Sequence, residues 1–320
     1  MIDRSPDRET IHLALSLAAR APSIDDSQPW LWRVGPQSLH LYANSDRGAP
    51  DSDAEQRDVL LSCGASLHHC VVALAALGWR AKVERLPDPA EPDHLAALQL
   101  YPHPASGLDV VLAAAIPRQR NDWRPYGSWP VSAADIALIG ARAAHAGTTT
   151  RRVESLPGLG HIVAQAVRRH AADYDQLGES VIRGGWYRSL ADIPRWNTPE
   201  SDSVVPQLSG TECAEDNAVL LALGTKEDSR LARLRAGEAT SVVLVSATAL
   251  GLASCPVAEP LQSAETRDEL QANLVGIVGS PQMLLRIGWP QVNADPLPSP
   301  PRRPLADVSE WLGPQSLTSA

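Results

Sequence analysis

Hydrophobic and polar positions divide the first part of the chain into a helix and a hairpin. Apolar residues recur at helical spacing from Ile11 to Ala18 behind a Ser5-Pro6 start signal, so we expect a helix that ends near Arg20. Beyond a proline-flanked loop, apolar and polar residues alternate over 30–34 and again over 39–41, on either side of a Gly-Pro turn. This alternation predicts a β-hairpin.

The remaining pattern mixes long helices with short strands. A helix is predicted from a polar cap at 51–53 to Gly78, a residue suited to the left-handed backbone that ends helices. Further elements follow the same reading: strands are expected at 80–86, 94–101, 148–154, 217–224 and 282–289, and helices at 132–146, 160–177 and 228–250.

Residues 178–216 have no regular period. The stretch contains Gly184-Gly185, several prolines, Trp186, Tyr187 and Trp196. Long irregular segments within compact domains are uncommon and are often lids over a site. The alternative is a surface insertion, but the aromatic residues favour docking on another part of the molecule, so we expect a lid.

The chain matches itself at a constant spacing of 173 residues. Gly64 and Ala76-Leu77-Gly78 fall in register with Gly237 and Ala249-Leu250-Gly251. A second block, Leu98–Pro102, is similar to Leu285–Pro290 in the same order. Alanine-rich helices also produce chance matches, yet two blocks in one order favour duplication of a half-chain unit.

Composition limits the class of protein. The 320 residues are 44% hydrophobic and 20% charged, with no apolar run near 18 residues, so no transmembrane helix is expected. Acidic residues before Ile11 argue against a secretory signal, and we expect a cytoplasmic protein. The net charge of −9 gives no general attraction for nucleic acid or an anionic membrane.

Neither cysteine nor histidine spacing indicates a metal site. Cys63, Cys70, Cys213 and Cys255 include no Cys-x-x-Cys pair, so we interpret them as small buried hydrophobic residues, with redox sensing as a minor alternative. The adjacent His68 and His69 point to different helix faces, which is poor ligand geometry.

The loop Ala21–Trp30 is the best candidate for a binding element. Its prolines, Pro22 and Pro29, fix φ and remove backbone donors, so the polar side chains between them are held in one direction. Such a loop suits a ligand clamp, although a well-ordered connection between a helix and a strand has the same composition.

This loop is similar to the Ala-Pro-Ser-x-x-Asn-x-Gln-Pro-Trp signature of the FMN-dependent nitroreductases. Cys63-Gly64-Ala65, Leu223-Gly224-Thr225 and Pro301–Leu305 occur downstream in the family's order. Together these motifs resemble, along nearly the whole chain, the Acg-like branch of single-chain nitroreductase-like flavoproteins. The resemblance implies an α+β nitroreductase-like fold, duplicated and fused into a pseudo-dimer, with FMN as cofactor.

The resemblance also implies which residues hold the cofactor. The segment Arg120–Tyr126 resembles the family's basic opening, and Pro301–Pro304 its basic tail; both face the flavin phosphate there, while Arg124 would lie near the pyrimidine edge of the ring. Only two lysines occur in the chain, so arginine or backbone N–H groups must hold any anion. Solvent-exposed arginines are the alternative. The expected cofactor-binding residues are Pro22, Ser23, Asp26, Gln28, Arg118, Arg120, Asn121, Asp122, Arg124, Val257, Ala258, Arg302 and Arg303.

The motifs are distributed unequally between the halves. The proline loop occurs only in the first half, 1–115, and the basic motifs only in the second, 116–320. In homodimeric nitroreductases these elements come from different subunits, so a fused chain would keep one complete FMN site and act as a monomer. No protein residue is expected to be catalytic, because flavin N5 itself accepts and gives hydride.

Two residues depart from the family pattern. Asp26 stands where the family favours Asn, and Asp122 where it favours Ser. A carboxylate cannot donate a hydrogen bond and disfavours a nearby phosphate, so we expect weaker flavin affinity or turnover. Two functions fit: an FMN-dependent oxidoreductase that passes hydride from NAD(P)H to a small electron-poor acceptor, or a flavin-binding or sequestering protein with a lid-covered FMN.

Overall fold

A computed structural model of the chain describes residues 5–44, 52–122, 124, 126–153, 217–274, 279–294, 296–297 and 299–312. The expected lid at 178–216 and the expected helix at 160–177 lie outside these residues. The helices are α1 (Arg8–Ala18), α2 (Asp53–Ala76), α3 (Gly107–Ala115), α4 (Ala133–Ala144), α6 (Arg230–Ala249), α7 (Ala264–Asn273) and α8 (Leu305–Val308), with short 3₁₀ turns η1 (Ile24–Asp26), η3 (Ile116–Arg118) and η5 (Glu259–Leu261). The strands are β1 (Trp30–Val34), β2 (Ser38–Ala43), β3 (Trp79–Arg85), β4 (His94–Pro102), β5 (Thr149–Val153), β6 (Val219–Thr225), β7 (Ala253–Val257), β8 (Ser280–Gly288) and β9 (Ser309–Trp311).

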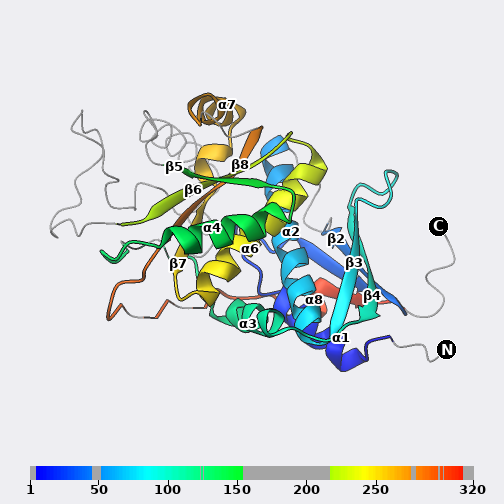
Figure 1. The fold of residues 1–320 in the computed structure, drawn as a ribbon. Helices are drawn as coiled ribbons and strands as arrows, with labels where there is room; N and C mark the ends of the chain where they lie inside the picture. The colour runs from blue at the N-terminus through cyan, green and yellow to red at the C-terminus, as the bar shows by residue number, and fades with distance from the viewer. Residues whose placement is uncertain are drawn as a thin grey trace.

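Helices α2 and α6 form the centre of the molecule. They lie side by side in Figure 1, with one sheet on either side, and their mutual contact is the most extensive between described helices. Both are buried on nearly every face, because each packs against the other and against a sheet. At their crossing, a Cβ on Gly64 would collide with the carbonyl oxygen of Leu234, and a Cβ on Gly237 with that of Leu61. The two glycines therefore allow the close approach.

One described helix bears on the expectation about membrane spans. Among the described helices, α2 is long and apolar enough to cross a membrane by length and composition. However, 72% of its most apolar window is buried inside the fold. Its apolar sequence is therefore that of a core helix, buried on all sides.

Two sheets carry the same succession of strands. The first has the order β3-β4-β2-β1-β9, and the second, read from its β7 edge, β7-β8-β6-β5. In both sheets a strand that follows the central helix lies at the edge, and the four corresponding strands pair antiparallel. The expected mixture of helices and mainly antiparallel sheets is confirmed.

The end of the described chain returns to the first sheet. β9 pairs parallel with β1, so that Trp32 lies opposite Ser309. The preceding residues 299–304 cross from the second half towards the loop that follows α1. A sequence-based division at residue 115 therefore separates residues that share one sheet.

Contacts between the halves recur at the spacing found in the sequence. His68 Nδ1 on α2 lies 2.7 Å from Ser241 Oγ on α6, and these two residues are 173 positions apart in the sequence. Arg57 donates to the carbonyl oxygen of Pro281 (3.3 Å), and Arg230, 173 residues after Arg57, donates to that of Pro92 (2.6 Å).

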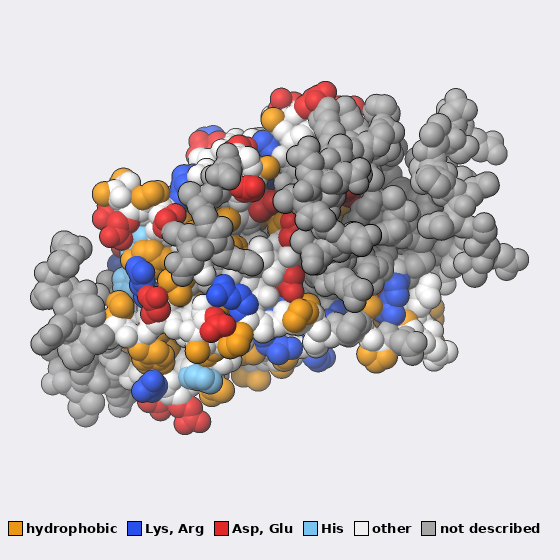
Figure 2. Space-filling model, turned by 180° about the vertical axis from the view of Figure 1, so that it is seen from behind, with side chains coloured by type: hydrophobic (Ala, Val, Ile, Leu, Met, Phe, Trp, Pro, Cys, Tyr) orange, Lys and Arg blue, Asp and Glu red, His pale blue; other side chains and the backbone are white. Residues whose placement is uncertain are grey.

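Most predicted elements have the expected type, with shifts at their ends. The helix α1 starts later than expected, because Asp7 and not Ser5 caps it by accepting from Thr10 N at 2.8 Å. The helices α3 and α7 and the strand β7 have no counterpart among the sequence expectations. On the face seen from behind in Figure 2, acidic and basic side chains of the described residues are mixed.

Candidate functional site

The proline loop is held in one conformation by its own polar groups and by α2. Ser23 Oγ accepts from Gln28 N (3.0 Å), and Ile24 N donates to Ser62 Oγ on α2 (3.1 Å). Asp25, Asp26 and Gln28 all have positive φ, between 47° and 53°. Non-glycine residues in this region are uncommon and cluster at functional sites, so the loop is a candidate binding element.

Gln28 fastens the C-terminal tail to this loop. Its Nε2 donates to the carbonyl oxygen of Pro301 (3.3 Å), and its Oε1 accepts from Arg303 N (2.9 Å). Its side chain is therefore committed on both sides of residue 302 and is 5% exposed. The loop and the basic tail, 273 residues apart, are brought together as expected.

A pocket of about 200 Å³ opens beside the tail. Three arginines from three segments line it: Arg20 from the end of α1, Arg120 from after η3, and Arg302 from the tail, with Ile116, Gln119, Ser299 and Pro300 completing the wall. Arg120 Nη1 donates to the carbonyl oxygens of Pro117 (3.0 Å) and Gln119 (2.7 Å), and its Nη2 contacts Ser299 Oγ. These backbone contacts fix the direction of the guanidinium group.

The charges around this pocket are only partly balanced. Arg302 Nη1 donates to Asp26 Oδ1 at 2.6 Å, whereas none of the described residues that line the pocket is acidic. Burial lowers the pKa of Arg302 and raises that of Asp26, although each group stabilises the charge of the other. Burial, followed by the charge of Arg20, also lowers the pKa of Arg120. An anion in the pocket would relieve this mutual repulsion.

Two arginine nitrogens in this region have no partner among the described residues. Arg120 Nε and Arg303 Nη1 are buried without a hydrogen-bond partner in the described structure. Buried donors are nearly always paired, so an unpaired one marks a position where a ligand or water oxygen belongs. Arginine donors suit a phosphate or carboxylate.

Asn121 and Asp122 lie beside strand β7. Asp122 N donates to the carbonyl oxygen of Ser254 (2.9 Å), and Asn121 forms an isolated bridge with the same residue. Both carboxylate oxygens of Asp122 accept from Arg124, at 2.9 Å from Nε and 2.8 Å from Nη2. Asp122 thus orients Arg124, while the hydroxyl of Tyr126 donates to the Asp122 carbonyl oxygen (2.7 Å).

The remaining expected residues differ in burial. The side chains of Val257 and Ala258 are each 2% exposed, and Pro22 is buried on the loop. Arg118 differs: it is exposed, its Nε donates to the carbonyl oxygen of Ala114 (3.1 Å), and it does not line the arginine pocket. Arg118 thus lies at the end of η3, outside the lining of the arginine pocket.

Sequence reasoning missed Arg20 and a carboxyl pair beside the loop. Arg20 directly precedes the loop motif, so its position could have suggested a role. Burial raises the pKa of Asp25 to about 6 and that of Asp58, on α2, to about 7. Gln262, just after η5, donates to Asp58 Oδ1 at 2.9 Å, and the charge of Asp25 further raises the pKa of Asp58.

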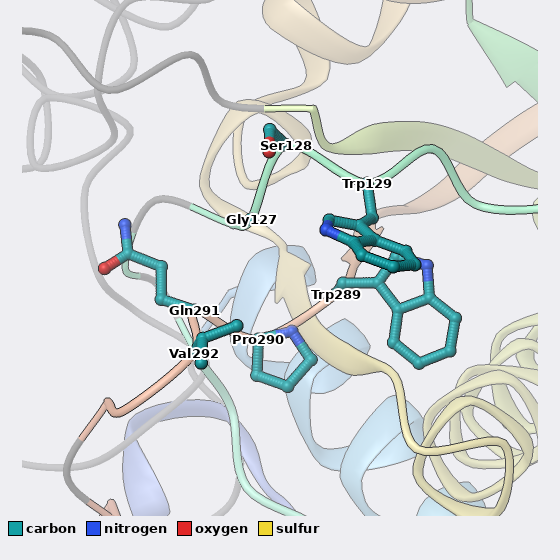
Figure 3. A pocket seen from close by; sticks show the side chains of 7 residues that line it. All are labelled: Gly127, Ser128, Trp129, Trp289, Pro290, Gln291 and Val292. Carbon is teal, nitrogen blue, oxygen red and sulfur yellow. The ribbon is translucent and has the colours of Figure 1, made fainter.

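A larger pocket of about 550 Å³ lies elsewhere, at the end of β8. Figure 3 shows the indole rings of Trp129 and Trp289 on one side and Gln291 and Val292 on the other. Its described lining, completed by Gly127, Ser128 and Pro290, contains no ionisable side chain. The smaller arginine pocket is therefore the candidate site for an anionic ligand.

Comparisons with solved structures give partial likenesses to flavoproteins. A BluB-like flavoprotein from Clostridium difficile is 16% identical, covers 63% of this chain and 99% of its own, and has a TM-score of 0.43. An iodotyrosine deiodinase bound to FMN and 3-iodo-L-tyrosine is 16% identical, covers 60% of this chain and 95% of its own, and has a TM-score of 0.42. No protein-family profile matches the chain.

Curated sequences are much more similar. "Putative NAD(P)H nitroreductase Rv3131" of Mycobacterium tuberculosis is 52% identical over 318 residues, which cover 96% of this chain and 92% of that protein. "Putative NAD(P)H nitroreductase acg" of the same organism is 32% identical over 339 residues, covering 96% and 97%. Both matches extend over nearly the whole of each chain, as the resemblance of the motifs had implied. The chain therefore belongs to the Acg family of nitroreductase-like proteins.

Proposed function

We propose that the chain is an FMN-dependent oxidoreductase of the nitroreductase type, which passes hydride from NAD(P)H to a small electron-poor acceptor. The family's names support this reaction class. The observation that carries the proposal is the meeting of Arg20, Arg120 and Arg302 in one pocket beside the proline loop. Three guanidinium groups with little counter-charge suit a phosphate monoester.

The residues present fit the phosphate end of FMN. A pocket of about 200 Å³ accommodates a phosphate and part of the chain that carries it, but it is smaller than the roughly 300–1,000 Å³ typical of whole small-molecule sites. The unpaired Nε belongs to Arg120, which lines this pocket, and would supply a further donor. When bound, FMN supplies the hydride chemistry through N5 of its ring.

The other expected residues have supporting tasks in this proposal. Val257 and Ala258, at the end of β7, would flank the ring. Arg124, oriented by Asp122, would place a positive charge near the ring's pyrimidine edge, where negative charge develops on reduction. The proline loop and Gln28 would fix the tail so that Arg302 and Arg303 stay beside the phosphate.

We also propose that the chain is a fused pseudo-dimer whose two halves, 1–115 and 116–320, meet between residues 115 and 116. The matching strand orders support this view, as do the reciprocal contacts Gly64–Leu234 and Gly237–Leu61. Reciprocity of this kind is characteristic of a two-fold interface, in which residue i contacts j′ and i′ contacts j. Because loop and arginine motifs occur once each, one FMN per chain and a monomer in the cytoplasm follow from the proposal.

One observation favours the second candidate function, a flavin-sequestering protein. The tail is tied to the loop by Gln28 and by the Arg302–Asp26 ion pair, so the tail arginines are held in place beside the pocket. A cofactor whose phosphate is held by such a fixed tail would dissociate slowly, as sequestration requires. A lid at 178–216 belongs to the same alternative.

Anaerobic reduction separates the two functions. The purified protein would be loaded with FMN and mixed with NADPH, and absorbance would be followed. Rapid loss of the flavin colour supports the oxidoreductase, whereas colour that persists until dithionite is added supports sequestration. A chain that takes up no FMN contradicts both.

A matched pair of variants tests the pocket itself. Arg120→Ala should weaken FMN retention, because a hydrogen bond to a charged group contributes roughly 1.5 to 3 kcal/mol. Arg118→Ala removes the same side chain outside the pocket and should leave retention unchanged. Equal retention by wild type and Arg120→Ala would remove Arg120 from the site.

A further inference from the structure

Arg302 can pair with two anions, the carboxylate of Asp26 and a phosphate in the arginine pocket. Its Nη1 donates to Asp26 Oδ1 at 2.6 Å, and its Nη2 donates to the carbonyl oxygen of Arg20 at 3.2 Å. The same side chain lines the arginine pocket together with Arg20 and Arg120. A carboxylate of the protein therefore occupies one donor of a side chain that lines the proposed phosphate position.

The backbone on both sides of Arg302 is fixed. Gln28 accepts from Arg303 N and donates to the carbonyl oxygen of Pro301, and its side chain is buried. Because residues 301 and 303 are both tied to the loop, the backbone of Arg302 cannot follow a ligand. Only its flexible side chain can turn between Asp26 and the pocket.

The three pocket arginines differ in their counter-charge. Arg302 is the only one of them with an ion pair to a carboxylate in the described structure. Arg20 and Arg120 donate to backbone carbonyl oxygens, at 3.3 Å and 3.0 Å from that of Pro117. A phosphate that enters the pocket would thus meet Arg20 and Arg120, which have no ion pair among the described residues, and Arg302, which must leave Asp26 to bind the phosphate.

We propose that Asp26 limits the affinity of the pocket for phosphate-bearing ligands by competing for the guanidinium group of Arg302. Asp26 is an internal competitor, and Arg302 contributes fully to binding only after it leaves Asp26. The inference deepens the proposed function, since it concerns the phosphate end of the same site. It assigns Asp26 a role opposite to that of a cofactor ligand.

The chain offers a clean test of this role. Asp26→Asn keeps the shape of the side chain and suits the local φ of 50°, because Asn tolerates the left-handed region as well as Asp does. The neighbouring Asp25 has a φ of 53° and no ion pair in the described structure. Asp25→Asn is therefore a matched control for the loss of a carboxylate on the same loop.

The first measurement uses inorganic phosphate alone and so does not depend on flavin binding. Phosphate would be titrated against wild type, Asp26→Asn and Asp25→Asn, with the shift in thermal unfolding temperature as readout. We expect phosphate to bind Asp26→Asn about five- to tenfold more tightly than wild type, because a charge-assisted hydrogen bond is roughly twice as strong as a neutral one. Asp25→Asn should bind as wild type does.

A double variant shows whether the effect passes through Arg302. In the Arg302→Gln background, Asp26→Asn should no longer change phosphate affinity, because the contested donor is absent. An unchanged or weaker affinity in Asp26→Asn, or an equal gain in the Arg302→Gln background, would overturn the inference.

Flavin titration then distinguishes this inference from the proposed function. FMN affinity should rise in Asp26→Asn, and riboflavin affinity should not. A phosphate effect without any FMN binding would support the competition and contradict FMN as the ligand. FMN binding that is equal in wild type and Asp26→Asn would support the ligand and contradict the competition.

Discussion

Gly64 on α2 faces Gly237 on α6 where the two central helices cross, and each glycine leaves space that a Cβ atom would take from the other helix. The atoms in the way are backbone atoms: the Leu234 carbonyl oxygen for Gly64 and the Leu61 carbonyl oxygen for Gly237. Backbone atoms cannot turn aside as a flexible side chain can. The crossing therefore depends on glycine at both positions.

Gly64→Ala should destabilise the protein by about 2 kcal/mol or more, because overpacking a filled core typically costs about 1 to 3 kcal/mol and these two helices cannot separate locally. Urea denaturation followed by circular dichroism measures the change. Gly107→Ala is the control: no atom lies within 4 Å of its added Cβ, so stability should be unchanged or slightly higher. Equal stability of both variants would contradict the close crossing.

Arg57→Ala should be strongly destabilising. Arg57 is 1% exposed and donates to the carbonyl oxygens of Pro281 and Gln282 and to Asp228. Its removal takes a buried donor from these two carbonyl oxygens, and an unsatisfied buried acceptor typically costs about 1 to 3 kcal/mol, while Asp228 keeps its ion pair with Arg233. Arg230→Ala, 173 residues later and more exposed, should cost less than about 1 kcal/mol by the same denaturation experiment. Similar losses in both variants would contradict the difference in burial.

Asp58 should make the protein less stable as the pH rises. Its pKa in the folded protein is about 7, raised by burial, whereas an unperturbed Asp has a pKa of about 3.9. Between these values the folded state binds more protons than the unfolded state, so stability falls from about pH 4 to pH 7 and is constant above.

Asp58→Asn removes this ionisation and can still accept the hydrogen bond from Gln262. Its stability at pH 8 should exceed that of wild type, and its decline between pH 5 and pH 8 should be smaller, in urea denaturation at both values. Asp268→Asn, on the exposed side of α7, should keep the wild-type dependence. An unchanged slope in Asp58→Asn would show that another group causes the decline.

Gln28→Ala should release the tail from the loop. The Arg303 amide donates to Gln28 Oε1, so its hydrogen exchange should accelerate when that acceptor is removed. Mass spectrometry of peptides covering 299–304 would measure the exchange. Gln99→Ala, on the exposed face of β4, should leave this segment as protected as in wild type. Unchanged exchange in Gln28→Ala would mean that other contacts hold the tail.

Local patterns were sufficient to predict much of this fold. Alternation identified the β1–β2 hairpin, and Ser52 and Gly78 marked the ends of α2, because caps and left-handed glycines act within a few residues. The pattern did not predict α7, whose sequence is mainly polar, or β7, which contains Pro256, a residue that is uncommon inside strands. Pairings such as β1 with β9 depend on long-range contacts that no local pattern contains.

The site was predicted in part for a similar reason. Motifs indicated the loop, Arg120 and Arg302; the structure places Arg120 and Arg302 in one pocket and joins Arg302 to the loop through Asp26. They could not indicate that Asp26 pairs with Arg302, that Gln28 is occupied by the tail, or that Arg118 turns away. The direction of each of these side chains depends on neighbours from distant parts of the chain.

The central claim is that one FMN binds per chain with its phosphate between the arginines. Titration of flavin-free protein with FMN and with riboflavin, followed by flavin fluorescence, tests it most directly. The account predicts one FMN per chain and riboflavin binding at least about tenfold weaker, since phosphate contacts to charged donors contribute more than 1.4 kcal/mol. Equal affinities for the two flavins, two FMN per chain, or no binding of either would contradict it.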